Sequence, residues 1–367
     1  MKKIIALILA LVLALSLVAC ASSPATNEDP STTDTTPAKT EDIQKEGETR
    51  IDTEIKTDES DNKDVKIAFV QTDVHPYYEP MPYALKDIAK NLGIREPDHI
   101  ILTTAMSAEE WAQQIDTLIT RGYDGIVTVV PGDAASEAKA QEVKDAGIAL
   151  SGVASAGSAL DQVDVFWCTN AYNATTTAVT SLCEALGGKG DIIHVTTMAA
   201  DMNTAERVRA VEDVLKKYPD INLVQTIADV DNTELAQNAV NNFFASGEHI
   251  DGILCTGGGC TTGTVAALRQ NDRKDLVVVG IDTDDATLAA IRDGYMMGTM
   301  YQDAYAQCYF ACLTCYKLAN GYKFVGDNKI MDSGSALITL DNIDEIESTK
   351  QVVRDEILAN IDNYFQK

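Results

Sequence analysis

The stretch Val65-Lys-Ile-Ala-Phe-Val70 is apolar at every position except Lys66. Strands that helices cover on both faces have such near-continuous apolar runs, because neither face meets water. Further short runs rich in Ile, Val and Leu follow at 99–102, 125–130 and 148–150. Longer amphipathic segments lie between them, so we expect an α/β fold in which helices flank a parallel sheet.

Local signals mark the ends of the predicted helices. Ser107 and Glu110 have the spacing of a capping box, which satisfies free N–H groups at a helix start. Gly93 and Gly147 follow helical patterns, where glycine readily takes the left-handed conformation that ends a helix. The predicted helices of this half lie near 79–92, 107–122 and 134–147.

The same alternation restarts after Phe166-Trp-Cys-Thr-Asn170. The second set of apolar runs lies at 191–195, 222–225, 252–255 and 276–280, and helical patterns lie near 173–187, 203–217, 233–246 and 261–271. We therefore expect two Rossmann-like lobes. The predicted N-terminal lobe comprises 65–169 plus 303–331, and the C-terminal lobe comprises 170–302 plus 332–367. Ligands bind outside the carboxyl ends of open parallel sheets, which predicts a ligand cleft between the lobes.

The N-terminal residues have the pattern of an export signal. Residues 1–19 combine a basic start with one apolar run, which predicts a signal peptide. The sequence Leu17-Val-Ala-Cys20 resembles a bacterial lipobox, which predicts lipidation of Cys20 and anchoring at the outer side of a cell membrane. The remainder of 20–64 has no aromatic residue and many Ser, Thr and acidic residues, so we expect a disordered acidic tether, suited to a Gram-positive surface.

The charge balance excludes some partners. The 367 residues include 56 acidic and 29 basic side chains, for a formal net charge of −27. Nucleic-acid binding requires Lys and Arg to displace counterions from phosphates. We therefore expect no nucleic-acid partner.

Four motifs in a fixed order resemble a known family. They are His75-Pro-Tyr-Tyr78, Asn203-Thr-Ala-Glu-Arg-Val-Arg209, Val279-Gly-Ile-Asp-Thr283 and Gly298-Thr-Met-Tyr-Gln302. Their order is similar to that of the ribose/galactose class of type I periplasmic solute-binding proteins of ABC transporters, over about residues 65–345. The resemblance implies the type I fold with a multi-strand hinge, ligand capture by lobe closure without catalysis or cofactor, a monomer, and a membrane permease as partner.

The resemblance also implies a set of ligand-binding residues: His75, Tyr77, Tyr78, Asn203, Thr256, Gly257, Asp282 and Gln302. Tyr77 and Tyr78 would cover the apolar C–H face of a sugar, while Asp282 and Gln302 would bond its hydroxyl rim. Structural roles are the alternatives: a hydrophobic plug for the tyrosines, a helix N-cap for Asp282 and a solvated amide for Gln302.

The sequence departs from the family pattern at other positions. Val153-Ala-Ser-Ala156 stands where monosaccharide-binding members often have an Asp-Arg pair. Ala205 stands where a ligand arginine is frequent, and we expect Arg207 and Arg209 to face structure or solvent. The glycines at 257–259 could enlarge the pocket for an oligosaccharide or glycoside, or form an anion nest at the following helix. A polyol, a nucleoside or a furanosyl signal such as autoinducer-2 therefore remain alternatives to a simple sugar.

Catalytic and metal-binding motifs are not found in the sequence. The four histidines lie far apart without a paired ligand spacing, and no G-x-S-x-G nucleophile elbow occurs. We expect no metal site and no enzyme activity. Two alternatives in other classes are a subunit that presents its ligand to a sensor kinase and an extracellular α/β enzyme.

One cysteine-rich motif could indicate a different function. Cys308, Cys312 and Cys315 have the C-x3-C-x2-C spacing of radical S-adenosylmethionine enzymes. However, the segment 304–320 has a helical apolar pattern, in which the first and last of these α-carbons would be about 10 Å apart. We expect the three thiols to pack against the sheet instead. Seven cysteines remain besides Cys20, so at least one must be unpaired in a monomer.

Overall fold

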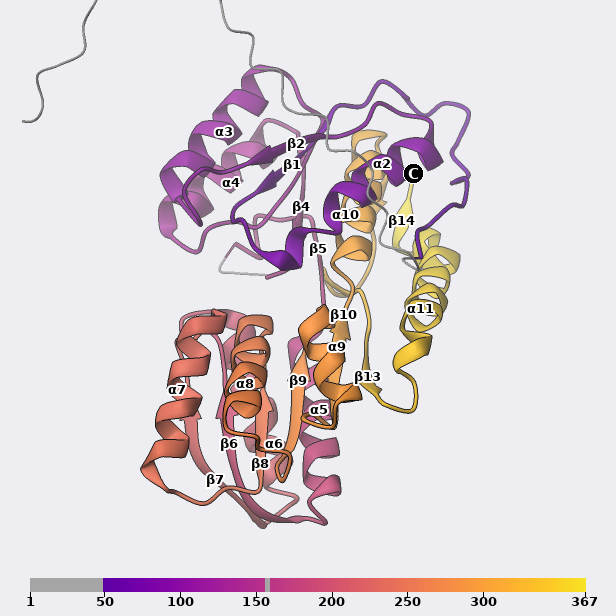
Figure 1. Ribbon diagram of the computed structural model, residues 1–367. Helices are drawn as coiled ribbons and strands as arrows, with labels where there is room; N and C mark the ends of the chain where they lie inside the picture. The colour runs from indigo at the N-terminus through magenta and orange to yellow at the C-terminus, as the bar shows by residue number, and fades with distance from the viewer. Residues whose placement is uncertain (1–48, 156–158) are drawn as a thin grey trace, which may run out of the picture. The chain divides into compact units, whose positions relative to one another are not determined.

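The computed structural model describes residues 49–155 and 159–367 (Figure 1). Its first lobe is built on a six-stranded sheet in the order β12-β5-β4-β3-β1-β2, with all pairings parallel. The strands are β1 (Ile67–Gln71), β2 (Asp98–Ile101), β3 (Gly125–Thr128), β4 (Ala149–Val153), β5 (Val165–Cys168) and β12 (Ile330–Asp332). The expected apolar runs thus form the central strands.

Helices cover both faces of this sheet. The helices are α2 (Met81–Leu92), α3 (Ala108–Thr120), α4 (Ala134–Asp145) and α10 (Ala304–Ala319). Phe69 of β1 packs with α2 and α10, whereas the adjacent Ala68 packs with α3 and α4. Strand residues point alternately to opposite faces, so continuous burial of β1 requires this arrangement.

The second lobe repeats the design. Its sheet has the order β13-β10-β9-β8-β6-β7, parallel except for the β10–β13 pair. The strands are β6 (Lys189–Val195), β7 (Asp220–Ile227), β8 (Gly252–Cys255), β9 (Val277–Ile281), β10 (Gly298–Gln302) and β13 (Ser335–Thr339). The helices are α5 (Ala171–Ala185), α6 (Met202–Leu215), α7 (Thr233–Ser246), α8 (Gly258–Gln270) and α9 (Asp285–Arg292). The predicted α/β class with two parallel-sheet lobes is confirmed.

Two of the helix-end predictions can be checked directly. Ser107 Oγ accepts the N–H of Glu110, which is the first half of the expected capping box. The Glu110 carboxylate instead accepts hydrogen bonds from the backbone N–H groups of Thr103 and Thr104, at 2.7 and 3.0 Å. Gly93 ends α2 in the left-handed conformation, with φ of 66°.

The cysteine-rich helix packs as expected. Cys308, Cys312 and Cys315 are fully buried in α10. The Cys315 thiol lies 3.6 Å from the Ile126 carbonyl, and a Cβ on Gly125 would lie 2.6 Å from Cys315 Cβ. Burial raises the pKa of the Cys315 thiol, so this thiol stays protonated. The prediction that these thiols contact the sheet is confirmed for Cys315.

The start of the described chain corrects the predicted tether boundary. Ile51 is buried against the first lobe, and its N–H donates to the Tyr305 hydroxyl at 3.0 Å. Arg50 forms an ion pair with Asp87 of α2 at 2.6 Å. A single apolar residue inside a polar segment is a weak sequence signal. This explains why the end of the tether was predicted at residue 64. Cys20 and the predicted signal peptide lie outside the described residues.

The C-terminal residues also cross the predicted lobe boundary. Helix α11 (Ile346–Asn360) starts against the core of the second lobe at Ile346. It is followed by β14 (Phe365–Gln366), which pairs with β11 (Lys323–Phe324), and Phe365 joins the core of the first lobe. The assignment of all of 332–367 to the second lobe is therefore wrong at its end.

A buried ion pair stands where the chain re-enters the first lobe. The chain passes between the sheets after β5, after β10 and after β12. Asp303, between β10 and α10, accepts two hydrogen bonds from Arg354 of α11, at 2.7 and 2.9 Å. The side chains are 2% and 3% exposed, respectively. This pair joins the second of these crossings, between β10 and α10, to helix α11.

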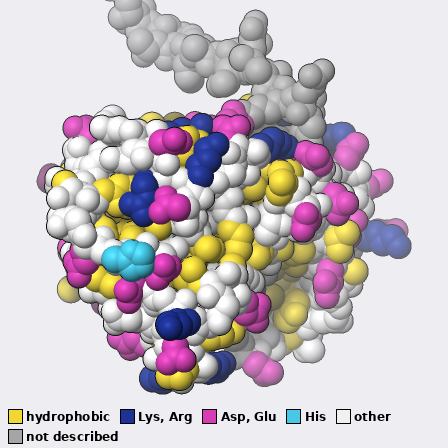
Figure 2. Space-filling model, turned by 60° about the horizontal axis from the view of Figure 1, so that its bottom comes forward, with side chains coloured by type: hydrophobic (Ala, Val, Ile, Leu, Met, Phe, Trp, Pro, Cys, Tyr) yellow, Lys and Arg dark blue, Asp and Glu magenta, His cyan; other side chains and the backbone are white. Residues whose placement is uncertain are grey.

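The surface agrees with the acidic composition. Lys and Arg side chains are scattered singly among acidic and neutral ones on the face shown in Figure 2, without a broad basic patch. Among the described residues, no helix is both long enough and apolar enough to span a membrane.

Candidate functional site

The carboxyl end of β1 leads into the first part of the site. The single-turn helix η1 (Pro76–Tyr78) begins there, and His75 caps it by accepting the N–H of Tyr77 on Nδ1 at 3.1 Å. The rings of Tyr77 and Tyr78 lie edge to face, with centroids 5.7 Å apart. The structure thus brings the three predicted residues of the first lobe together.

Tyr77 is held by a residue that the sequence analysis did not identify. Its hydroxyl donates to Gln307 Oε1 at 2.7 Å, and burial followed by the nearby Asp282 charge raises its pKa. Gln307 is fully buried, and its amide also reaches Ser333 Oγ at 3.1 Å. A glutamine in an otherwise apolar helix, one turn after Asp303, was the available signal. Gln307 therefore links the predicted stacking aromatic to the hinge.

Asp282 provides the second lobe's carboxylate at the end of β9. Its backbone has a φ of 74°, held by hydrogen bonds with Met300 and Thr299 at 2.8 Å each. Gln302 Nε2 donates to Asp282 Oδ1 at 2.7 Å, so these two predicted residues meet. Burial raises the pKa of Asp282, which the Gln302 hydrogen bond partly offsets. The N-cap of α9 is Asp284 rather than Asp282.

The glycines after β8 make room for neighbouring groups. A Cβ on Gly258 would lie 2.4 Å from Asp282 Oδ2, and one on Gly257 would lie 2.3 Å from Thr197 Cγ2. Helix α8 begins at Gly258, so its positive end faces the Asp282 carboxylate. The interpretations of a widened pocket and a free anion nest are therefore wrong. Close packing explains the glycines, and the protein's own carboxylate lies where the anion would bind.

Thr256 does not face the site. It is fully buried, and its hydroxyl donates to Thr196 Oγ1 at 2.8 Å while lying 2.7 Å from His194 Nε2. Because the Thr256 hydroxyl hydrogen is donated to Thr196, the His194 ring must donate its own hydrogen to Thr256 through Nε2. The Nδ1 atom of His194 has no hydrogen-bond partner among the described residues. Because its hydroxyl is committed to this buried network, Thr256 is not among the predicted residues that the structure brings together at the site.

This network gives a pH-dependent prediction. Burial, followed by the charge of Arg207, lowers the pKa of His194 from 6.5 to about 3. Below pH 6.5 the unfolded chain therefore takes up a proton that the folded chain refuses, and stability falls as pH decreases towards 3. At pH 5 this one group should cost about 2 kcal/mol relative to pH 7. Urea unfolding of wild type and His194→Gln at both pH values measures it.

The His194→Gln variant should lose about 2 kcal/mol of the stability difference between pH 7 and pH 5. His249→Gln is the matched control, because its side chain is 73% exposed. It should retain the wild-type difference between pH 7 and pH 5. Equal pH dependence in wild type and His194→Gln would contradict the buried neutral imidazole.

Arg207 of α6 is buried within the protein, which is one of the two expected alternatives. Only 8% of the residue is exposed, and its Nη1 donates to Thr197 Oγ1 at 3.1 Å. Its Nε has no partner among the described residues, and its charge acts on Asp231 and Asp282. Arg207 lies four residues after the predicted Asn203, and so on the same helix face, which is the signal that was overlooked. Arg209 is solvent-facing, as expected, and pairs with Glu206.

Asn203 lies where the two lobes touch. Its side-chain amide donates to the Ala154 carbonyl of the first lobe at 3.3 Å. Beside it, Ser155 Oγ donates to Asp201 Oδ1 at 3.1 Å, and the same oxygen caps α6 through the Asn203 N–H. Asn203 therefore lies at the edge of the site, and its side chain is hydrogen-bonded to the first lobe.

Three further carboxylates at strand ends were not predicted. Asp73 follows β1, Asp201 precedes α6 and Asp231 follows β7. Loss of solvent raises the pKa of Asp231, with Asp201 and Asp73 adding to the rise and His75 and Arg207 opposing it. Charged groups of both lobes thus act on one another at this edge.

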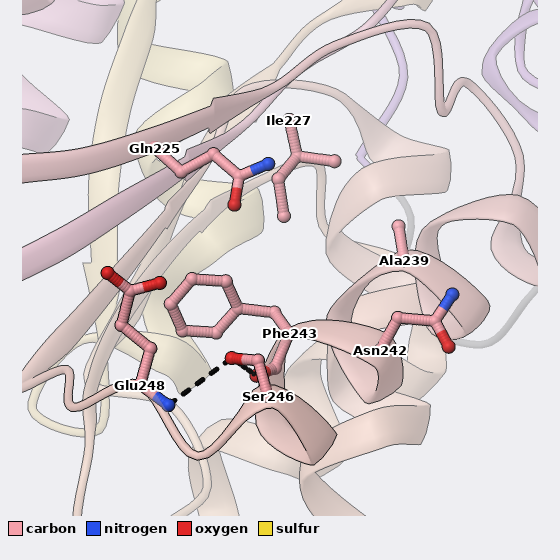
Figure 3. A pocket seen from close by; sticks show the side chains of 7 residues that line it. All are labelled: Gln225, Ile227, Ala239, Asn242, Phe243, Ser246 and Glu248. Carbon is pink, nitrogen blue, oxygen red and sulfur yellow. Dashed lines mark hydrogen bonds between the residues drawn. The ribbon is translucent and has the colours of Figure 1, made fainter.

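Two other surface features lie away from this edge. A hollow of about 360 Å³ between β7 and α7 is shown in Figure 3; it is lined by Gln225, Ile227, Ala239, Asn242, Phe243, Ser246 and Glu248. It contains none of the predicted site residues. At the opposite ends of the strands, Asp191, His249 and Asp251 bring ligand atoms within 4.8 Å of one another, although His249 Nε2 already lies 3.1 Å from Asp251 Oδ1. These are the described residues that could hold a metal ion.

Comparisons with known proteins identify the family of this chain. A family model described as "Periplasmic binding protein domain" matches residues 67–323. A xylitol-binding protein of Mycolicibacterium smegmatis is 30% identical over 196 residues, which cover 52% of this chain and 55% of that protein. The match thus spans about half of that relative. A D-apiose import binding protein of Paraburkholderia graminis is 26% identical over 235 residues, which cover 63% of this chain and 73% of that protein.

Solved structures show the same fold. A solute-binding protein of an ABC transporter from Burkholderia graminis, in complex with D-arabinose, has a TM-score of 0.69 and 23% identity, covering 77% of this chain and 97% of that chain. One from Bacillus halodurans with bound myo-inositol has a TM-score of 0.70 and 20% identity, covering 78% and 99%. The relatives are binding proteins, not enzymes. The chain belongs to the periplasmic binding protein domain family, and its type I fold is that of the sugar-binding proteins of ABC transporters.

Proposed function

We propose that this protein is the extracytoplasmic substrate-binding lipoprotein of an ABC importer and captures a sugar or sugar-like polyol. The observation that carries the proposal is the hydrogen bond between Gln302 and Asp282 at the ends of neighbouring strands of the second lobe. The Asp282 charge also helps to raise the pKa of Tyr77 in the first lobe, after burial. An aromatic ring and a carboxylate match the C–H face and the hydroxyl rim of such a solute. The relatives named above as binding xylitol and D-apiose support this ligand class.

Binding would act by closing the lobes. A ligand shifts an opening equilibrium only by its difference in affinity for the two states, so it must contact both lobes in the closed one. His75, Tyr77 and Tyr78 would bind it from the first lobe, and Arg207 and Asp282 from the second. The crossings at Asn170, Gln302 and 331–336 would absorb the rotation. Closed protein would then deliver the ligand to the permease.

The site residues divide into two groups under this proposal. His75, Tyr77, Tyr78, Arg207, Asp282 and Gln302 would contact the ligand. Asn203 would instead hold the lobe edge, and Gly257 would allow the close approach of Thr197. Lipidation at Cys20 would anchor the monomer to the membrane, with the acidic segment before residue 49 as its tether.

A thermal melting panel tests the ligand class. Purified protein is heated with pentoses, hexoses, polyols, nucleosides and a furanosyl signal. A ligand at a hundred times its Kd adds about 2.7 kcal/mol to the free energy of unfolding, which gives a shift of several degrees. We expect such a shift with at least one sugar or polyol and none with nucleosides. Stabilisation by nucleosides or the furanosyl signal alone would contradict the assignment and favour a sensing role.

A further inference from the structure

A buried amide joins the candidate site to the hinge. Gln307 lies in the otherwise apolar first half of α10 and is 0% exposed. Its Oε1 accepts the Tyr77 hydroxyl at 2.7 Å. Its Nε2 donates to Ser333 Oγ at 3.1 Å and to Thr169 Oγ1 at 3.4 Å. An amide nitrogen has two hydrogens, and both have an acceptor here, so the orientation of the side chain is fixed.

The amide contacts the chain at each of its three passages between the sheets. Thr169 follows β5 directly, and Ser333 follows β12 directly. Gln307 itself lies one turn after Asp303, which follows β10 and caps α10. The Ser333 N–H also donates to the Cys168 carbonyl at 2.9 Å, which joins the first passage to the third. One side chain therefore connects all the segments that would rotate when the lobes close.

The same amide holds a ring that a ligand can reach. The Tyr77 ring is only partly buried, whereas its hydroxyl ends on the fully buried Gln307. Breaking that hydrogen bond would leave a buried acceptor unpaired, which is costly. The ring and the amide should therefore move together, and a shift of the ring would reach the hinge.

We propose that Gln307 is a positioning residue that couples Tyr77 to the three hinge crossings, so that ligand contact at the ring and rotation of the lobes are linked. This inference rests on the proposed function, because that function places the ligand on Tyr77. It predicts that Gln307 and Ser333, which are both fully buried, help to determine ligand affinity without touching the ligand.

A double-mutant cycle in ligand affinity tests the coupling. The probes are the sugars and polyols of the melting panel, with xylitol, D-arabinose and myo-inositol among them, titrated by calorimetry. Gln307→Met keeps the length of the side chain and removes its hydrogen bonds, and Tyr77→Phe removes only the hydroxyl. Each should lower the affinity of the bound probe about tenfold, and the double variant should lose little more than either one. Losses that multiply in the double variant would overturn the inference.

A variant at the hinge and a matched control locate the effect. Ser333→Ala removes one partner of the amide and should lower affinity about threefold. Thr314→Val is the control, because Thr314 lies two turns after Gln307 in α10, is fully buried, and accepts the Trp167 Nε1–H at 3.0 Å. It should lower the melting temperature and leave affinity unchanged. Equal losses of affinity in Thr314→Val and Gln307→Met would mean that packing of α10, rather than the amide, determines binding.

A measurement without ligand separates this inference from the proposed function. Nitroxide labels at Ala138→Cys of α4 and Ala245→Cys of α7, both exposed positions, report the separation of the lobes by pulsed electron paramagnetic resonance. The native cysteines of the described residues are buried, so the labels go to the introduced thiols. Gln307→Met should widen the distance distribution of the ligand-free protein, and Thr314→Val should not.

An unchanged distribution in Gln307→Met would overturn the coupling to the hinge, whatever the ligand is. A widened distribution together with no binding by any sugar or polyol would support that coupling and contradict the proposed function alone.

Discussion

Replacement of Arg354 by methionine is expected to lower the free energy of unfolding by about 3 to 5 kcal/mol. The methionine fills much of the same space but leaves the Asp303 carboxylate buried and without its cation. Removing one partner of a buried pair is costly because the remaining charge has lost both water and its counter-ion. Asp303 also caps α10 through the Ala306 N–H, so the loss should loosen the start of that helix. Urea unfolding followed by circular dichroism measures the change.

An exposed ion pair provides the matched control for this substitution. Arg292 pairs with Asp344, whose side chain is 87% exposed, so Arg292→Met should cost less than about 1 kcal/mol. If Arg354→Met does not fold, Arg354→Lys keeps the charge and should fold with a smaller loss. Equal effects of Arg354→Met and Arg292→Met would contradict a stabilising role for the buried pair at the hinge.

Replacement of Asp282 by asparagine should lower ligand affinity about tenfold to hundredfold, as expected for loss of a hydrogen bond to a charged group. Asparagine fits the backbone, because it tolerates the left-handed conformation seen at this position. The raised pKa shows that burial penalises the carboxylate in the folded protein. Stability at neutral pH should therefore be retained or increased. Calorimetric titration and thermal melting measure the two effects.

Asp284→Asn is the neighbouring control, and it should behave in the opposite way. Asp284 caps α9 by accepting the N–H groups of Ala286 and Thr287 and the Thr287 hydroxyl. Asparagine also caps helices, so the cost should stay within about 1 kcal/mol, and ligand affinity should be unchanged. Loss of affinity in Asp284→Asn comparable to that in Asp282→Asn would mean that the whole loop, rather than one carboxylate, determines binding.

The sequence predicted the lobes well because local and global signals agree there. The run Val65–Val70 contains most of β1 (Ile67–Gln71), which is buried on both faces between two helix layers. Ser107 and Gly93 marked helix ends where the backbone required them. Asp282 and Gln302 were named from the family resemblance, and they meet because each lies at the end of a strand and strand ends of parallel sheets converge.

The misplaced residues share a physical cause. Thr256 also follows a strand, but the direction of its hydroxyl is set by His194 and Thr196, which are 62 and 60 residues away in sequence. Arg207 was expected to face structure or solvent; it is buried against Thr197, and its charge also acts on Asp282, which lies 75 residues further along the chain. Such tertiary contacts override position in the chain, and they leave no mark on the local pattern.

Titration calorimetry of the best ligand from the melting panel, followed by recovery of that ligand, tests the central claim most directly. The proposed function predicts one bound sugar or polyol per chain and chemically unchanged ligand after prolonged incubation. Conversion of the ligand into a product, or the absence of binding by every sugar and polyol in the panel, would contradict it.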